Sequence, residues 1–239
     1  MPEEGVPNIP HDEVLRLEDI AEVVRTAAEL GFDKIRLTGG EPLVRKGIVD
    51  LVAMLSEIEG IRDLAMTTNG VLLSRYARDL KEAGLMRVNV SLDSMDRDTF
   101  RTIARRDRLQ DVLDGIRAAD EAGLTPIKIN TVLLRDGDRG EADGVAAFAR
   151  KNGYEIRYIH QMNLQTGEFW PVEGGEGGNC GRCNRLRLSS RGIIYPCLFS
   201  DAGYDIHAYG IEDAIRAAVQ NKPRHGVISK KNTFYGLGG

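Results

Sequence analysis

A unit made of an apolar helix face, a glycine and a β run repeats along the first two thirds of the chain. The first unit places Ile20, Val23 and Ala27 at helical spacing, followed by Gly31 and the run 34–38. The five runs predicted as strands are 34–38, 64–68, 87–92, 126–132 and 155–161. Each predicted helix ends at a glycine, where a C-cap needs a positive φ: Gly31, Gly60, Gly84, Gly123 and Gly153.

Strands that alternate with helices predict parallel βαβ units with right-handed crossovers. The pattern alone leaves a full barrel, a partial barrel and a doubly wound sheet open. In all three folds, ligands bind at the carboxyl ends of the strands, so chemistry is expected there.

The predicted strands carry polar side chains at alternating positions, whereas parallel strands buried on both faces are usually continuous Val, Ile and Leu. A single such residue is most often a satisfied interior side chain. Polar positions on all five strands instead predict a polar cavity inside an open barrel. Arg36, Lys128 and Arg157 would give this cavity a positive charge suited to a phosphate-bearing ligand.

The first strand runs into the sequence TGGEPL, residues 38–43. Gly39 and Gly40 let backbone groups approach a ligand closely, and Glu41 adds a carboxylate that could hold an ammonium group or a ribose hydroxyl. A tight βα turn with no ligand would use the same residues.

The chain has three cysteines, Cys180, Cys183 and Cys197, an odd number at close spacing that favours a metal or reactive site over disulfides. Structural zinc usually has four protein ligands, and His207 is the nearest candidate for a fourth. Three thiolates fit a [4Fe–4S] cluster with one iron left open to a ligand. A thioredoxin-like CxxC is disfavoured because the motif does not follow the first strand of a βαβ unit.

The repeating pattern stops after Gln161. Residues 166–179 are rich in glycine and acidic side chains and are predicted to be a linker, so the chain divides into a domain at 1–165 and a small domain at 180–239. In the second domain Arg185 and Arg187 alternate along a short predicted strand and share a face. Beside a cluster they would suit a triphosphate, although arginines are most often solvated.

Composition narrows the function classes. The 239 residues carry a net charge of −4, so nothing indicates nonspecific binding to nucleic acid or anionic membranes. No stretch approaches the length of a membrane span, and the polar start is unlike a signal peptide. We expect a cytoplasmic protein.

Taken together, these residues resemble the radical S-adenosylmethionine (SAM) GTP 3′,8-cyclases of molybdenum cofactor biosynthesis (MoaA). The matching segments are MPEEG, KIRLTGGEPLVR, TTNG, RVNVSLDS, KINTV, IRYIHQM, CGRCNRLRL with Cys197, and the terminal GG. The resemblance implies an α/β fold, a partial (βα)6 barrel with a small C-terminal iron–sulfur domain. It also implies a lyase that uses SAM to convert GTP to a 3′,8-cyclo-dihydro-GTP.

The resemblance further implies roles for individual residues. Those implied to bind SAM are Gly39, Gly40, Glu41, Ser91 and Met162. Those implied to bind GTP are Arg36, Thr67, Lys128, Arg185 and Arg187. Arg157 is implied to lie near the reacting groups, and the three cysteines to hold a [4Fe–4S] cluster. The implied partners are an electron donor, the next enzyme of the molybdopterin pathway (cyclic pyranopterin monophosphate synthase), and a second copy in a homodimer.

Two departures from the family pattern bear on function. The family's CxxxCxxC loop lies immediately before MPEEG, so the ligands of the SAM-cleaving cluster and the first barrel strand are missing here, and we expect a truncated sequence. The segment between Met162 and Cys180 is also shorter than usual. Another radical SAM maturase with an auxiliary cluster, or a non-catalytic remnant that binds a cluster and GTP, therefore remains an alternative.

Overall fold

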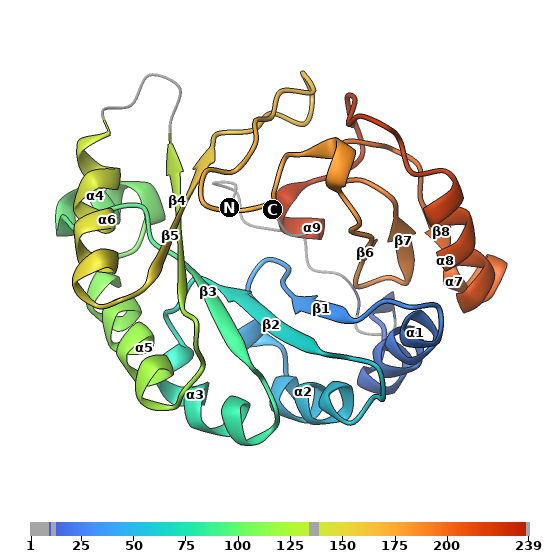
Figure 1. The fold of residues 1–239 in the computed structure, drawn as a ribbon, viewed down its shortest axis with the longest axis horizontal. Helices are drawn as coiled ribbons and strands as arrows, with labels where there is room; N and C mark the ends of the chain where they lie inside the picture. Colours follow the sequence, from blue (N-terminus) through green and yellow to red (C-terminus); the bar gives the residue numbers. More distant parts are fainter. Residues whose placement is uncertain (1–9, 11–12, 134–138, 238–239) are drawn as a thin grey trace.

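Five parallel strands form the main sheet of the chain. The computed structural model describes residues 10, 13–133 and 139–237. The strands follow one another in chain order across the sheet: β1 (Lys34–Leu37), β2 (Asp63–Thr68), β3 (Arg87–Ser91), β4 (Lys128–Leu133) and β5 (Glu155–His160). All four neighbouring pairs are parallel. Figure 1 shows the sheet curved into an arc with the helices outside it, which is the arrangement of a partial barrel and excludes a doubly wound sheet.

The helices connect successive strands along the outer, convex side (Figure 1). They are α1 (Leu17–Glu29), α2 (Ile48–Ser56), α3 (Leu73–Glu82), α4 (Arg97–Ala104), α5 (Leu109–Glu121) and α6 (Gly140–Lys151), with a short 3-10 turn, η2 (Pro42–Val44), after β1. Five strands were predicted from the sequence within one or two residues of these bounds. The five glycines expected at helix ends all have positive φ. Helix α4 and the turn η2 were not predicted.

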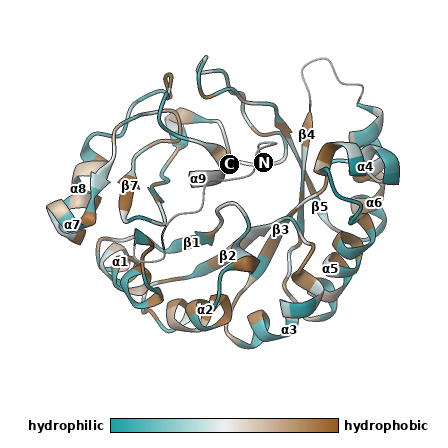
Figure 2. Ribbon diagram, turned by 180° about the vertical axis from the view of Figure 1, so that it is seen from behind, coloured by the Kyte–Doolittle hydropathy of each residue, from teal (hydrophilic) through white to brown (hydrophobic). Residues whose placement is uncertain are grey.

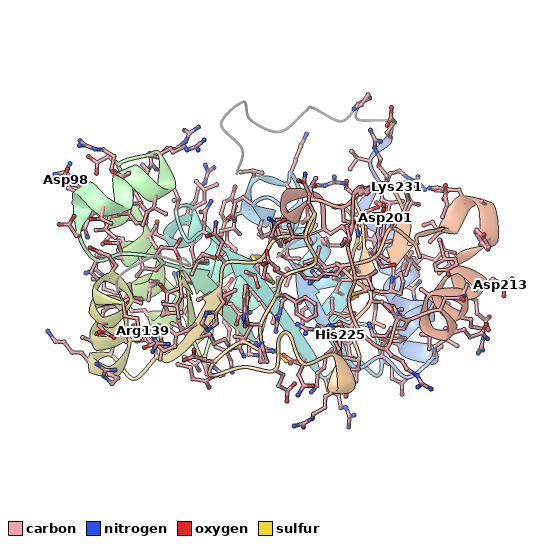
Figure 3. All side chains as sticks on the ribbon, turned by 90° about the horizontal axis from the view of Figure 1, so that it is seen from above. Asp98, Arg139, Asp201, Asp213, His225 and Lys231 are labelled. Carbon is pink, nitrogen blue, oxygen red and sulfur yellow. The ribbon has the colours of Figure 1, made fainter. Side chains whose placement is uncertain are left out.

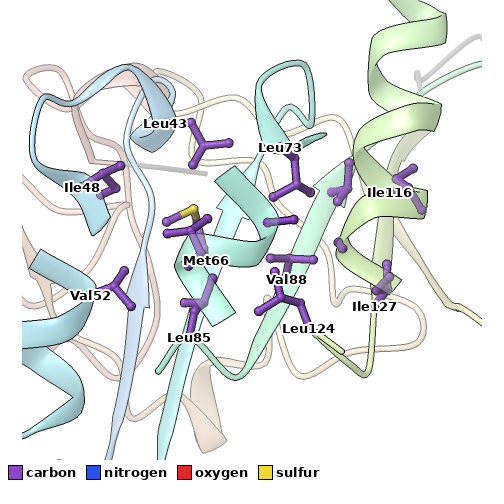
Figure 4. Close-up of a cluster of buried hydrophobic side chains, with 14 of the residues drawn as sticks. Leu43, Ile48, Val52, Met66, Leu73, Leu85, Val88, Ile116, Leu124 and Ile127 are labelled. Atoms are coloured by element: carbon purple, nitrogen blue, oxygen red, sulfur yellow. The ribbon is translucent and has the colours of Figure 1, made fainter. Parts of the chain in front are cut away.

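The core lies between the strands and the outer helices. Leu64 and Met66 of β2 and Val88 of β3 are fully buried against α2, α3 and α5 (Figure 4). Strand side chains alternate between the two faces of a sheet. The positions between these apolar residues therefore point to the inner, concave side. The hydropathy colouring of Figure 2 is mixed along the strands, as this alternation requires.

The segment predicted to be a linker is packed along the free edge of β5. Tyr158 and Glu173 exchange backbone hydrogen bonds of 3.0 and 3.1 Å as an antiparallel bridge. A second bridge joins Asn163 to Glu168. We refer to residues 163–178 as the strap. The strap covers part of the sheet edge that β5 would otherwise expose.

A small antiparallel sheet follows the strap. It contains β6 (Arg187–Leu188), β7 (Ile193–Tyr195) and β8 (Tyr204–Asp205), and it is preceded by the 3-10 turn η3 (Cys180–Arg182). The chain continues through α7 (Ile206–Tyr209), α8 (Ile211–Gln220) and α9 (Phe234–Leu237). β8 and α7 were not predicted from the sequence.

This C-terminal part shares a core with the barrel. Leu15, just before α1, and Val23, within α1, are buried side chains. They belong to one hydrophobic cluster with Ile194, Ala214 and Ile215. Figure 1 shows α8 and the small sheet beside α1. The predicted boundary at 180 stays a prediction. No helix in the described ranges has the length and apolar character needed to cross a membrane.

Candidate active site

Arginines from three strands point to the concave side of the sheet. Arg36 of β1, Arg87 of β3 and Arg157 of β5 occupy the inner positions of their strands. Burial is the largest cause that lowers the pKa of Arg36 to about 10. Neighbouring guanidiniums lower it further: Arg87, Arg157 and Arg185. Solvent reaches one side of the Arg36 side chain, and protein surrounds the rest. Burial and the neighbouring positive charges therefore both lower the pKa of Arg36. The four arginines form one cationic cluster.

Two inner positions, one of them Arg87, carry ion pairs at the start of the strands. Arg87 donates hydrogen bonds of 3.0 and 2.6 Å to the two oxygens of Asp63. Lys128, predicted to contact a phosphate-bearing ligand, forms a close ion pair with Glu155 on the neighbouring strand. Lys128 is therefore partly neutralised in this structure, whereas Arg36 is surrounded mainly by like charge.

Several buried polar atoms on this inner face lack a hydrogen-bond partner. Within the described part of the chain these inner atoms are Arg87 Nη1, Asn89 Oδ1, Asn130 Oδ1 and Arg157 Nε. Thr67 is already engaged, because its Oγ1 accepts a 3.1 Å hydrogen bond from Asn89 Nδ2. Buried polar groups are normally satisfied, and unsatisfied ones cost free energy. The two guanidinium nitrogens need acceptors and the two asparagine oxygens need donors, so this face fits a ligand that carries both kinds of group.

Glu41 ties the loop after β1 to the end of β2. Its Oε1 accepts hydrogen bonds from Thr68 Oγ1 at 2.6 Å and from the Leu43 N–H at 3.1 Å, and its Oε2 accepts from the Asn69 N–H at 2.7 Å. The carboxylate thus holds the loop that contains Gly39, whose φ of 141° favours glycine. This structural role was not foreseen from the sequence, and the predicted SAM contact stays a prediction.

The other predicted SAM contacts lie at the same ends of the strands. Ser91 ends β3 and is exposed. Nearby, Asp93 accepts a 2.8 Å hydrogen bond from the Val132 N–H, which ties β3 to β4, and burial raises the pKa of this carboxyl. Met162 follows β5 and is half-buried beside Leu164. Gly39, Gly40, Glu41, Ser91 and Met162 therefore share one edge of the sheet, as the rule for parallel strands requires.

The three cysteines gather at the open end of the β6–β7 hairpin. Cys180 begins η3, Cys183 follows it, and Cys197 lies just beyond β7; all three thiols are free and half-buried. Burial raises the pKa of the Cys197 thiol, and the charges of Cys183 and Cys180 raise it further, so the three groups are close. As placed, no three His, Cys, Asp or Glu side chains among the described residues form a ready metal cage. The donor set and its surroundings nevertheless fit a three-thiolate cluster.

Cations surround these thiols. Burial favours the neutral form of Cys183, yet the Arg185 N–H and the charges of Lys222 and Arg185 together hold its pKa below the usual value. Arg187 is the more buried of the two predicted arginines. Burial, followed by the charge of Arg185, lowers the pKa of Arg187 to about 10. Its guanidinium also donates a 3.0 Å hydrogen bond to the Leu237 carbonyl, which brings the C-terminal helix to the site.

His207 lies away from the cysteines. A Cβ added at Gly192 would meet His207 Nε2 at 3.1 Å, and Gly192 is in the turn at the closed end of the β6–β7 hairpin. The cysteines are at the open end of that hairpin. This placement disfavours His207 as a fourth zinc ligand.

The strap touches the cationic cluster. A Cβ added at Gly175 would lie 3.3 Å from Arg157 Nε. Glu176, one residue further, is close enough for its charge to act on Arg157 and to oppose the lowering of its pKa by burial. The segment predicted as a linker is therefore one wall of the site.

Four residues of the site were not predicted from the sequence. These are Asp63, Arg87, Glu176 and Lys222. Arg87 could have been found, because it begins the alternating run RVNVS and so shares a face with Asn89 and Ser91. Lys222 follows a helix far along the chain and has no local signal.

The comparisons agree with this geometry. Residues 3–149 match the Radical SAM superfamily, so the chain is a radical SAM protein with a partial barrel. The chain is 41% identical to the GTP 3′,8-cyclase of Thermodesulfovibrio yellowstonii in an alignment that is 252 positions long with its gaps. This alignment covers 86% of this chain and 78% of the relative. It is 39% identical to the GTP 3′,8-cyclase of Geobacter sulfurreducens in an alignment that is 284 positions long with its gaps. This alignment covers 97% of this chain and 87% of the relative. The chain belongs to the GTP 3′,8-cyclase family.

Solved structures support the fold. SuiB of Streptococcus suis, solved with S-adenosylmethionine bound, matches with a TM-score of 0.65 at 14% identity, over 89% of this chain and 60% of that one. The protein named anSMEcpe, solved with AdoMet bound, matches with a TM-score of 0.63 at 14% identity, over 88% of this chain and 72% of that one. These similarities extend through the C-terminal part, not only the barrel.

Proposed function

We propose that the protein acts as a GTP 3′,8-cyclase, which converts GTP to (8S)-3′,8-cyclo-7,8-dihydroguanosine 5′-triphosphate. The observation that carries this proposal is the cationic cluster of Arg36, Arg87, Arg157 and Arg185 on the inner face, together with the unsatisfied polar atoms beside it. The triphosphate of GTP supplies the opposite charge and acceptors for the guanidinium nitrogens, and the hydroxyl and amino groups of the nucleoside supply donors for the two asparagine oxygens.

The proposed GTP site joins the two parts of the chain. Arg36 and Arg157 contribute from the sheet, and Arg185 and Arg187 from the small domain. Guanidiniums bind phosphate oxygens in pairs, which fixes the position of the triphosphate as well as its affinity. Thr67, near the end of β2, and Lys128, at the start of β4, lie on the same face and line the site. Arg157 is proposed to act nearest the reacting ribose.

SAM is proposed to bind at the edge formed by Gly39, Gly40, Glu41, Ser91 and Met162. When bound to a reduced iron–sulfur cluster, SAM supplies the deoxyadenosyl radical that the reaction needs. The loop held by Glu41 would fix the backbone groups that face SAM.

Cys180, Cys183 and Cys197 are proposed to hold a [4Fe–4S] cluster whose fourth iron is open to the guanine. Lys222, Arg185 and Arg187 would offset the negative charge of three thiolates and a cluster. The other proposed partners are an electron donor, the cyclic pyranopterin monophosphate synthase that takes the product, and a second copy of this chain. The protein is proposed to act in the cytoplasm.

The first test concerns the nucleotide. We expect the cluster-loaded protein to bind GTP about tenfold more tightly than ATP, the effect of about one additional hydrogen bond to the base edge. The cluster-free protein is expected to bind both through the triphosphate with little preference. Anaerobic isothermal titration calorimetry measures both affinities. Equal binding of GTP and ATP by the loaded protein would favour another radical SAM substrate.

The second test concerns the metal. After anaerobic reconstitution we expect iron and sulfide at these cysteines and no stoichiometric zinc, because three thiolates leave zinc one protein ligand short. Metal analysis and the EPR spectrum of the reduced protein measure this. A Cys197→Ser variant is expected to lose the signal, and Ser189→Ala, a nearby polar change outside the thiol set, to retain it. Zinc in place of iron would contradict the proposed cluster.

A further inference from the structure

Lys222 is held on a rigid base next to the cysteines. It lies just beyond the C-terminal end of α8, whose Ala214, Ile215 and Ala218 are buried against α1. Pro223 follows directly, and a proline disfavours helical backbone at the preceding residue. The helix therefore ends here, and the position from which the Lys222 side chain projects is fixed.

The ammonium of Lys222 joins the two loops that carry the cysteines. Its Nζ donates a 2.6 Å hydrogen bond to the carbonyl of Arg185 and a second, short hydrogen bond to the carbonyl of Pro196. Arg185 is two residues after Cys183, and Pro196 is immediately before Cys197. One side chain thus fixes the position of one loop relative to the other.

The backbone cannot make this connection by itself. The β6–β7 ladder ends at the pair Arg187 and Tyr195. Pro196 and the residues before Arg187 lie beyond this last pair, so the ladder does not hold the two loops together. An ammonium group has three donors and no acceptor, so it can satisfy both carbonyls where the ladder stops.

The same ammonium lies close to the thiols. Its positive charge is near enough to attract negative charge at both Cys183 and Cys197. Lys222 is only partly exposed, so solvent weakens this attraction less than it would at the surface. A cluster bound by three thiolates would add negative charge at this point.

We propose that Lys222 is a positioning residue of the cysteine site. It sets the separation of the loops that carry Cys183 and Cys197, and it places a fixed positive charge beside the ligands of the cluster. This inference rests on the proposed cluster site, but it concerns a residue of α8's C-terminal flank that neither the cysteine motif nor the barrel includes.

The test compares Lys222→Met, which keeps the stem and removes the charge and donors, with Lys222→Arg, which keeps a cation. Lys151→Met, an exposed lysine at the end of α6, is the matched control. In the metal-free protein, we expect Lys222→Met to speed hydrogen exchange of residues 183–187 and 195–199 about tenfold, a factor that corresponds to ~1.4 kcal/mol of local stability. Exchange elsewhere is expected to stay unchanged.

After anaerobic reconstitution, Lys222→Met is expected to release iron to a chelator about tenfold faster than the parent. Lys222→Arg should be intermediate and Lys151→Met like the parent. If Lys222→Met does not fold, as judged by circular dichroism, Lys222→Gln, which keeps one donor group without the charge, provides the same comparison.

The results distinguish a failure of the proposed cluster site from a failure of the proposed role of Lys222. A parent that binds no iron at these cysteines removes the cluster site and, with it, this role for Lys222. A parent that binds iron, together with a Lys222→Met variant that matches it in both exchange and iron release, overturns the role of Lys222 alone. Faster exchange without faster iron release would also overturn it, because Lys222 would then hold the loops without any effect on the cluster.

Discussion

Replacement of Arg36 by alanine is expected to weaken GTP binding roughly 10- to 100-fold, the effect of losing a charge-assisted hydrogen bond of ~1.5–3 kcal/mol. The same change is expected to leave the ligand-free protein at least as stable as the parent. The two effects have opposite signs because Arg36 is surrounded mainly by like charges, which Asp63 offsets only in part and a bound anion would neutralise.

The pKa of Arg36 gives the sign of the expected change in the stability of the ligand-free protein. Its value of about 10 in the folded protein lies below the ordinary 12.5, so the folded state holds the proton less tightly than the unfolded state. Its charged form therefore opposes folding at all pH values below about 10, and this cost is relieved as the pH rises through that value. At neutral pH, removal of the charge or binding of a triphosphate relieves it instead.

Anaerobic calorimetry measures both halves of the prediction: titration for the GTP affinity, and thermal scanning for the ligand-free stability. Arg62→Ala is the matched control, since Arg62 is 80% exposed and pairs with Asp33 outside the site. GTP binding that is unchanged in Arg36→Ala, or a clear loss of stability without ligand, would show that Arg36 serves the fold rather than the nucleotide.

Replacement of Glu41 by alanine is expected to lower the free energy of unfolding by about 2–4 kcal/mol. The loss removes the acceptors of three hydrogen bonds, from Leu43 N–H, Thr68 Oγ1 and Asn69 N–H, and leaves their donors without a partner. SAM binding should weaken as well, because the loop with Gly39 and Gly40 would lose its anchor to β2.

Glu41→Gln should be intermediate, because its amide keeps one acceptor oxygen and turns an NH₂ toward a donor. Glu59→Ala, a change of an exposed carboxylate on the loop before β2, is the control for charge alone. Urea unfolding of the four proteins measures the differences. A Glu41→Ala variant with parental stability would mean that the carboxylate is free to bind a ligand, as the sequence first suggested.

Periodicity was sufficient to predict the five parallel strands, but it left open which fold they form and how the parts of the chain meet. The apolar faces and terminal glycines gave each strand of the sheet, because both signals are local. The alternation in RVNVS and KINTV likewise predicted an inner polar face. The pairing of Lys128 with Glu155 was not predictable, because Glu155 reaches Lys128 only through the register of β4 and β5.

The C-terminal site shows the same limit. The CxxC spacing predicted that the cysteines act together, and the structure brings them together at the end of a hairpin. Lys222 could not be found in the same way, since it lies 25 residues beyond Cys197 and acts through backbone carbonyls that have no residue signature. Asp201 is similar: it binds the turn at Ser229 and the Lys231 N–H, and Figure 3 shows it beside Lys231.

The short strap between the barrel and the cysteines can follow its path only with glycine at two of its positions. A Cβ at Gly178 would lie 2.1 Å from the Trp170 carbonyl oxygen, and one at Gly174 would lie 2.5 Å from that of Ile156. Both residues also have positive φ. The alignment with the Geobacter sulfurreducens relative is longer than this whole chain, so that relative has residues with no counterpart here. A strap of this length therefore needs glycine at these two positions, so any homologue with an equally short strap should carry glycines at both places.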